Sequence, residues 1–343
     1  MNNGCFILAI ESSCDDTSVA VSHNDNILAN IISSQHIHEV YGGVVPELAS
    51  RAHLQQITQV CHTAIKKANI SLSHIHAIAY TRGPGLLGSL LVGSSFAKAL
   101  SVALGVPLIE VNHLEAHVLA HFIANQYESK PASPMLCLTV SGGHTQLIKV
   151  ENEYEFKLLG QTIDDAAGEA FDKAAKIIGL PYPGGALMEK LALQGNPNKF
   201  ELANPRIPEL NFSFSGLKTS FLYLVNKHQQ KDPEFIRNNQ ADLAASMQRA
   251  IIKHLMGKAK LALEETGPYR AVALAGGVSA NQALRKNMDE LAQQFGLKSY
   301  APKMEYCTDN AAMIAIAAWY KFQKQQFCEL SAPTLARMPV KST

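Results

Sequence analysis

Two histidines, His113 and His117, stand four residues apart in a segment that the sequence predicts to be helical through Phe122. On a helix, residues at this spacing lie about 40° apart on one face, so both imidazoles can reach one metal ion. His121 continues the same row and is a possible competing ligand. The alternative is a polar helix face that carries its histidines incidentally, because the chain has 13 of them. The pair therefore requires a third ligand from elsewhere in the chain.

Asp309 is the best candidate for that ligand. It lies in the segment Cys307-Thr-Asp-Asn310, at the start of the last predicted helix, where the chain can return to its N-terminal part. Two imidazoles and one carboxylate with open coordination positions suit Fe(II) or Zn(II). His113, His117 and Asp309 are therefore a candidate site for one such ion, and incidental histidines remain the alternative.

The position of Glu115 argues against a metalloprotease. In the zinc-protease signature H-E-x-x-H, the glutamate directly follows the first histidine and activates the metal-bound water. Here the acid comes one residue later, which turns it about 200° away from His113 on a helix. We expect Glu115 to work in packing or in partner docking.

Four glycine turns join predicted strands to predicted helices or close hairpins. Backbone N–H groups in such turns can hold an anion, although a single glycine pair more often forms only a tight turn. None of the four matches the Walker or dinucleotide fingerprints. We expect a nucleotide to be held between opposed hairpins and turns. The turns are Gly83-Pro-Gly85, Ser141-Gly-Gly143, Pro183-Gly-Gly185 and Gly276-Gly277.

The elements that carry these residues occur twice along the chain. Each half begins with a predicted hairpin, at residues 6–21 and 135–150, and later shows a strand, a glycine turn and a helix. This repetition predicts a duplicated α/β fold. We expect a first lobe over 1–125, completed by a C-terminal helix over about 307–335. The second lobe covers 126–306, with a helical insertion over about 196–268.

Composition limits where the protein is expected to be located and how it can bind nucleic acid. The chain has 343 residues, 47% of them hydrophobic, and we expect no apolar run to approach the roughly 20 residues of a membrane span. Without a signal-peptide pattern, we place the protein in the cytoplasm, off the membrane. The six cysteines are scattered, which indicates reduced thiols. With 30 Lys and Arg against 29 Asp and Glu, nucleic-acid binding needs a local basic face or a partner.

Nine stretches resemble, in the same order, the tRNA N6-adenosine threonylcarbamoyltransferase family, called TsaD in bacteria. They span nearly the whole chain. The stretches are I-E-S-S-C-D-D-T from Ile10, G-P-G-L-L-G-S-L from Gly83, N-H-L-E-A-H from Asn112, V-S-G-G-H-T from Val140, D-D-A-A-G-E-A-F-D-K from Asp164, Y-P-G-G from Tyr182, F-S-F-S-G-L-K-T from Phe212, G-G-V-S-A-N from Gly276 and C-T-D-N-A-A-M-I from Cys307.

The resemblance implies the actin-like ATPase fold shared by sugar kinases, Hsp70 and actin, with one Fe(II) or Zn(II) per subunit on His113, His117 and Asp309. It implies transfer of threonylcarbamoyl from threonylcarbamoyl-AMP to the N6 amine of an adenosine in tRNA. A TsaB-like paralogue, docked through first-lobe helices, and a TsaE-like ATPase would be its partners. The implied substrate-binding residues are Thr139, Val140, Ser141, Gly142, Gly143, Asp172, Gly185, Glu189 and Asn281.

Some roles stay open at this point. Glu11 and Asp15, in the tip of the first hairpin, are candidates for catalysis or proton handling, but turn formation explains them equally well. Candidate RNA contacts are basic residues, most of which would merely solvate a helix face. These are Arg51, Arg82, Lys218, Arg249, Lys253, Lys258 and Lys260.

Two other classes of protein compete with the transferase. A sugar kinase would share the fold and the nucleotide site, but it would leave the histidine pair without a task. A noncatalytic scaffold resembling the inactive paralogue would have lost metal ligands, whereas all three candidates are present in this chain.

Overall fold

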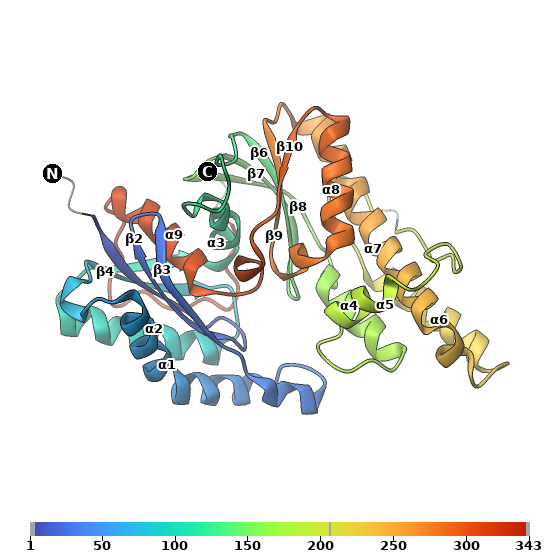
Figure 1. Ribbon diagram of the computed structural model, residues 1–343, viewed down its shortest axis with the longest axis horizontal. Helices are drawn as coiled ribbons and strands as arrows, with labels where there is room; N and C mark the ends of the chain where they lie inside the picture. Colours follow the sequence, from blue (N-terminus) through green and yellow to red (C-terminus); the bar gives the residue numbers. More distant parts are fainter. Residues whose placement is uncertain (1–3, 206, 341–343) are drawn as a thin grey trace. The chain divides into compact units, whose positions relative to one another are not determined.

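The computed structural model describes residues 4–205 and 207–340 (Figure 1). By its internal contacts the chain divides into two compact units. Unit 1 contains Met1–Pro131, Glu153–Phe156 and Pro302–Thr343, and unit 2 contains Ala132–Asn152 and Lys157–Ala301. The lobe boundaries expected from the sequence, 1–125 and 126–306, stay predictions.

Unit 1 is built on a five-stranded sheet of order β3-β2-β1-β4-β5 among the described residues. The strands β1, β2 and β3 form an antiparallel meander, while β4 pairs in parallel with both β1 and β5. Parallel β4 and β5 place their carboxyl ends at the same edge of the sheet as that of β1, so the residues that follow these strands gather there. The bounds are Phe6–Glu11 (β1), Thr17–His23 (β2), Asn26–Ser33 (β3), Ala77–Gly83 (β4) and Leu108–Asn112 (β5).

The helices of unit 1 pack in two groups. The long helices α1 and α2 contact each other and the sheet, and α9 packs on the sheet together with the short α3 (Figure 1). Leu8, Ile10 and Tyr80 are buried in the core that the strands share with α1 and α2. The bounds are Pro46–Ala68 (α1), Leu87–Leu104 (α2), His113–Leu119 (α3) and Ala311–Gln323 (α9), with 3₁₀ turns at His36–Tyr41 (η1), Leu72–His74 (η2), Ala120–Phe122 (η3) and Met304–Tyr306 (η5).

Helix α2 corrects one expectation from the sequence. In the part of the chain that the structure describes, it alone is long and apolar enough to cross a membrane by length and composition. The statement that no apolar run approaches such a span was therefore wrong for this segment. Leu90 and Ala97 are fully buried, and the helix packs on β4 and α1. A core helix passes the same length and composition test, so this one feature is weak evidence for a membrane.

Unit 2 repeats the topology of unit 1. Its sheet has the order β10-β9-β6-β7-β8 within the described residues, again with an antiparallel hairpin beside two parallel strands. The two sheets have the same strand order when β6 to β10 are matched in turn with β1 to β5. This match confirms the predicted duplication. The bounds are Met135–Val140 (β6), Thr145–Asn152 (β7), Glu155–Gln161 (β8), Ala271–Ala275 (β9) and Lys298–Tyr300 (β10).

Five helices and one 3₁₀ turn complete the described part of unit 2. Buried residues of α4, α6, α7 and α8 form one hydrophobic core with one face of the sheet. The two longest, α6 and α7, fall in the segment 196–268 that the sequence indicated as a helical insertion. The bounds are Ala167–Ile177 (α4), Gly185–Ala192 (α5), Ser215–Gln229 (α6), Phe235–Thr266 (α7), Gln282–Gln294 (α8) and Gly277–Ala280 (η4).

Candidate functional site

The histidine pair is placed by a helix cap at the end of β5. Asn112 is buried, and its Oδ1 accepts the N–H groups of Leu114 at 2.9 Å and Glu115 at 3.3 Å. A side-chain acceptor before the first turn satisfies N–H groups that have no partner within the helix. Asn112 Nδ2 also donates to the carbonyl of Pro339 at 2.8 Å. These bonds start α3 at His113, so that His117 follows one turn later.

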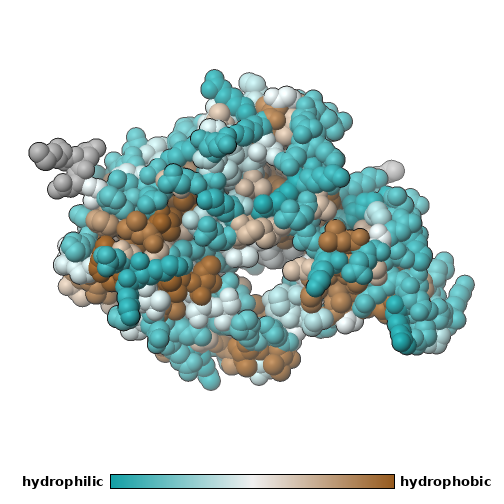
Figure 2. Space-filling view, viewed as in Figure 1, coloured by the Kyte–Doolittle hydropathy of each residue, from teal (hydrophilic) through white to brown (hydrophobic). Residues whose placement is uncertain are grey.

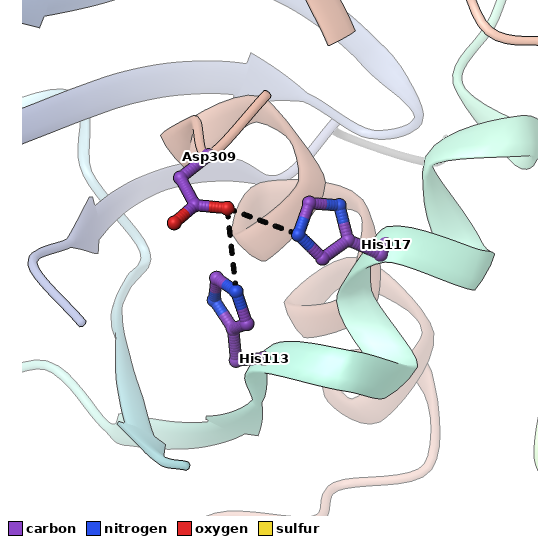
Figure 3. A group of neighbouring side chains, drawn as sticks. All are labelled: His113, His117 and Asp309. Atoms are coloured by element: carbon purple, nitrogen blue, oxygen red, sulfur yellow. Dashed lines mark hydrogen bonds and ion pairs between the residues drawn. The ribbon is translucent and has the colours of Figure 1, made fainter. Parts of the chain in front are cut away.

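Asp309 meets both histidines (Figure 3). Its Oδ1 lies 3.1 Å from His117 Nε2 and 3.4 Å from His113 Nε2. The three ligand atoms lie within 4.8 Å of one another. Two ligands held about 2.1 Å from one ion are about 3.0 to 3.4 Å apart at octahedral to tetrahedral angles, so these separations suit a small transition metal.

The two sides of His113 face different carboxylates. Its Nε2 is turned to Asp309, while its Nδ1 lies 3.0 Å from Glu11 Oε2 and 3.2 Å from Ser13 Oγ. Burial opposes a positive charge on the ring, but Asp309 and Glu11 outweigh it and hold the pKa of His113 well above its usual value. Burial likewise raises the pKa of Asp309, yet His113 and His117 bring it well below the usual range. Both carboxylates are therefore ionised, and a metal ion that bound His113 would replace the proton on its Nε2.

Two neighbours of the pair are excluded as ligands by the structure. Helix α3 ends at Leu119 and continues as a 3₁₀ turn, so His121 leaves the row, and its Nδ1 bonds Tyr127 Oη at 2.7 Å. Glu115 is 7% exposed and does not belong to the converging group found among the described residues. Its burial favours packing over docking to a partner.

Glu11 sits deeper than a hairpin tip would suggest. It is the last residue of β1 and is fully buried. Its Oε1 accepts the N–H of Ser13 at 2.5 Å, and its Oε2 accepts the hydroxyl of Thr81 at 2.6 Å. Burial raises the pKa of Glu11, but the charge of His113 overcomes this and lowers it. Sequence reasoning missed Thr81 as a partner of Glu11, because nothing local indicates a hydroxyl 70 residues away.

The rest of the hairpin tip is acidic. Asp15 and Asp16 are half-buried. Burial raises the pKa of Asp16 to about 6. The predicted role of Asp15 in catalysis stays a prediction.

The turn between β6 and β7 has the open geometry expected of a binding loop. Ser141 N–H donates to the carbonyl of His144 at 2.8 Å, and His144 N–H donates to Ser141 Oγ at 3.1 Å. A Cβ added to Gly142 or Gly143 would meet nothing within 4 Å. Thr139 and Val140 are fully buried in β6. Any ligand contact of these two residues would therefore use the backbone.

Asp172 and Gly185 are brought together by helix α4. The N–H of Gly168, near the start of α4, donates to the carbonyl of Ser141 at 3.2 Å, and Asp172 is one turn further along the same face. Asp172 Oδ1 accepts the N–H groups of Gly184 at 2.9 Å and Gly185 at 3.1 Å. Burial raises the pKa of Asp172, and these two backbone bonds oppose that rise. The loop 141–143, Asp172 and Gly185 thus border one face of α4.

Glu189 and Asn281 meet at the start of α8. Glu189 Oε1 accepts the N–H of Gln282 at 2.6 Å, so it is not merely a solvated helix residue. Asn281 Oδ1 caps α8 by accepting the N–H of Leu284 at 2.9 Å, and its Nδ2 donates to Gln248 Oε1 at 2.8 Å. Asn281 is nearly buried. Its side chain is occupied by these bonds, and its predicted contact with the substrate stays a prediction.

The remaining glycine turns are packed against other parts of their own units. A Cβ on Gly83 would lie 2.0 Å from the carbonyl oxygen of Leu335, and one on Gly85 would lie 2.5 Å from that of Ser13. Gly276 has a positive φ of 81°, and a Cβ added there would lie 2.5 Å from the carbonyl oxygen of Val140. These glycines permit close backbone contact. Of the predicted turns, the loop 141–143 has the most open surroundings.

Charge is divided unevenly between the units. Unit 2 has 19 Lys and Arg against 15 Asp and Glu, a net charge of +4, whereas unit 1 has 11 against 14, a net charge of −3. Among the candidate RNA contacts, Arg82 pairs with Glu110 and Lys218 with Asp165. Lys258 bonds the carbonyls of Ile207 and Glu209, and Lys260 pairs with Glu264. Arg51, Arg249 and Lys253 are exposed.

A sequence profile described as TsaD, tRNA N6-adenosine threonylcarbamoyltransferase, matches residues 26–316. The protein of that name from Christiangramia forsetii is 55% identical over 331 residues, which cover 96% of this chain and 97% of that protein. The protein of the same name from Porphyromonas gingivalis is 53% identical, over 99% of this chain and all of that protein.

Solved structures with much lower identity share the fold. HypF from T. kodakarensis superposes with a TM-score of 0.61 at 15% identity, over 94% of this chain and 48% of that one. Component A of (R)-2-hydroxyglutaryl-CoA dehydratase from Acidaminococcus fermentans gives 0.54 at 16% identity, over 93% and 98%. With the duplicated topology, this likeness confirms the expected actin-like ATPase fold.

Proposed function

Because the chain belongs to the tRNA N6-adenosine threonylcarbamoyltransferase family, we propose that it transfers threonylcarbamoyl from threonylcarbamoyl-AMP to the adenosine adjacent to the anticodon. The substrates are tRNAs that read codons beginning with A, and the products are N6-threonylcarbamoyladenosine and AMP. Family membership makes the chain a tRNA-modifying transferase. The observation that carries the finer proposal is the convergence of buried His113 and His117 with half-buried Asp309.

In this reaction the exocyclic amine of adenosine attacks the carbamoyl carbon of the donor. A carbon–nitrogen bond forms, the bond from that carbon to the phosphate oxygen breaks, and the amine loses a proton. The reaction needs an oriented, polarised electrophile more than a protein nucleophile. The loop 141–143, which has open surroundings, is suited to hold donor oxygens through backbone N–H groups. Asp172 uses Oδ1 for Gly184 and Gly185, which leaves Oδ2 to accept from a ribose hydroxyl.

His113, His117 and Asp309 would hold one Fe(II) or Zn(II) per subunit. The donor set of two ring nitrogens and one carboxylate fits either ion, and the separations of 3.1 and 3.4 Å support the assignment. A bound ion of this kind supplies Lewis acidity toward donor oxygens. Asp309 contributes the one anionic ligand, and its side chain is 27% exposed, which leaves a path to the cluster from solvent.

RNA and protein partners would use different surfaces. Exposed Arg249 and Lys253, one turn apart on the positively charged unit 2, are suited to phosphate contacts. A TsaB-like paralogue would dock on α1 and α2, where Leu54, Leu87 and Leu91 are about half exposed or more. Figure 2 shows apolar patches over this part of unit 1. A TsaE-like ATPase completes the proposed set, and the cytoplasm is the proposed location.

The test is a reconstituted transfer reaction. The metal-loaded protein, with both partner proteins present, is incubated with threonylcarbamoyl-AMP and unmodified tRNA, and the digested nucleosides are analysed by mass spectrometry. We expect threonylcarbamoyladenosine in a tRNA that reads A-starting codons and none in a tRNA that reads other codons. Failure to form the modified nucleoside under these conditions would contradict the proposal.

A further inference from the structure

We propose that Glu11 is a positioning residue for the metal centre: it holds the imidazole of His113 so that Nε2 is presented to the ion. The inference rests on the proposed metal site and adds to it a residue that does not itself bind the ion. Its basis is the contact between Glu11 Oε2 and His113 Nδ1 at 3.0 Å, on the side of the ring opposite Asp309.

The chemistry of imidazole makes this contact directional. A histidine that gives Nε2 to a metal carries its ring hydrogen on Nδ1 and needs an acceptor there. A carboxylate provides that acceptor, fixes the tautomer and makes the ligating nitrogen more basic. Ser13 Oγ, at 3.2 Å from the same nitrogen, is a neutral and longer contact. Glu11 is therefore the group that can set both the orientation and the ligand strength of His113.

Glu11 is itself held rigidly, as a positioning residue must be. Its carboxylate is fully buried and accepts from Ser13 N–H through Oε1 and from Thr81 through Oε2. Ser13 lies in the turn that follows β1, and Thr81 lies in β4, which pairs with β1 in the same sheet. These two bonds and the contact with His113 Nδ1 occupy both oxygens, so Glu11 is poorly placed to accept a proton from a substrate. The geometry favours positioning over the proton handling considered from the sequence.

The second histidine provides an internal contrast. The Nδ1 of His117 is buried and has no hydrogen-bond partner among the described residues. His117 therefore lacks the carboxylate support that His113 receives. Because a buttressing carboxylate is present at one ligand only, removing the charge of Glu11 should act on metal binding through His113.

The experiment measures metal affinity directly. Purified full-length protein, stripped of metal, is titrated with Zn²⁺ in competition with a chromophoric chelator, and with Co²⁺ while its d–d absorption spectrum is recorded. We expect Glu11→Gln, which keeps the volume and removes the charge, to weaken binding about 10- to 100-fold and to alter the Co²⁺ spectrum. Glu110→Gln is the matched control: it removes a half-buried carboxylate that pairs with Arg82, and it should leave both readouts unchanged.

A coupling measurement separates positioning from general damage. The residual Zn²⁺ affinity of the two histidine variants, which no longer retain metal on purification, is titrated at higher metal concentration. Adding Glu11→Gln should weaken this residual affinity little in His113→Ala but clearly in His117→Ala. If Glu11→Gln folds poorly, Thr81→Val loosens the same carboxylate and should lower affinity several-fold.

Two kinds of failure are distinguishable. If Glu11→Gln binds as tightly as Glu110→Gln while the ligand variants lose the ion, the positioning role is wrong and the metal site stands. If wild-type protein binds no ion that depends on His113, His117 and Asp309, both the metal site and the inference built on it are overturned.

Discussion

Replacing Gly142 by valine should abolish donor binding while leaving the fold intact. A Cβ at this position meets nothing within 4 Å, and the residue is exposed at the tip of the β6–β7 turn. The substitution therefore creates no clash within the described protein, and its effect on the free energy of unfolding should stay within about 0.5 kcal/mol. That corresponds to a change in Tm of no more than about 2 °C.

The loss in donor affinity should be much larger. The proposed contacts are the N–H groups of Gly142 and Gly143 with donor oxygens, and the branched side chain of valine would stand where the donor approaches. Each hydrogen bond to a charged group contributes about 1.5 to 3 kcal/mol. Losing two of them costs about 3 to 6 kcal/mol of binding free energy, which raises the dissociation constant roughly 100- to 10,000-fold.

The assay is isothermal titration calorimetry with a non-hydrolysable analogue of threonylcarbamoyl-AMP, accompanied by thermal unfolding. Gly168→Ala is the contrasting variant, because its Cβ would lie 2.6 Å from the carbonyl oxygen of Ser141. This overpacking should lower stability by about 1 to 3 kcal/mol. Unchanged donor affinity in a folded Gly142→Val protein would refute the binding role and reduce the loop to a turn.

Three further outcomes are expected. Purified protein should contain about one Fe(II) or Zn(II). The variants His113→Ala, His117→Ala and Asp309→Ala should each lose this ion, whereas His121→Ala should keep it. Metal retained in the first three variants, if they fold, would disprove the ligand set. Glu115→Gln should retain most single-turnover transfer, whereas Asp309→Asn should lose at least about tenfold; an equal collapse in both, with metal still bound in Glu115→Gln, would show that the role of Glu115 is misassigned. His254 is buried with its ring edge-to-face against Phe212 and Phe214, and burial, together with the charge of Lys258, lowers its pKa from 6.5 to about 4. Because the unfolded state binds this proton more readily, the contribution of neutral His254 to the free energy of unfolding is complete above about pH 6.5 and is lost as pH falls toward 4. About 1.4 kcal/mol of this contribution should be lost by pH 5.5. Urea unfolding at pH 7.5 and 5.5 should show a smaller acid loss in His254→Gln, and an equal loss in both proteins would refute this assignment.

Much of the fold could be predicted because its signals are local. Both hairpins appear as alternating apolar residues around a polar turn, and both form with the expected strands. The strand and glycine turn at Ala271–Gly277 were also expected, although a 3₁₀ turn, η4, separates them from α8. Helix α3 began where expected but ended at Leu119, which removed His121 from the row of ligands. Helical structure does extend through Phe122 as expected, and periodicity did not indicate the change from α-helix to 3₁₀ turn after Leu119.

The donor side of the site was only partly predictable. Glycine spacing marked four turns, but it did not distinguish those that pack against backbone from those that face open space. Position 83 requires glycine because the backbone of Leu335, more than 250 residues later, packs against it, whereas a side chain at position 142 would meet open space. A contact between chain segments so far apart leaves no trace in either segment alone.

The sequence by itself determined the duplicated strand pattern, the four-residue spacing of His113 and His117, and the carboxylate ahead of the last helix. Spacing and pattern are properties of neighbouring residues, so they can be interpreted without coordinates. Only the tertiary structure decided that Asp309 reaches both histidines and that Glu11 contacts His113 at the ring nitrogen opposite Asp309. These contacts join residues 102 or more positions apart in the chain. They exist because parallel strands and the returning α9 place distant residues at one edge of a sheet.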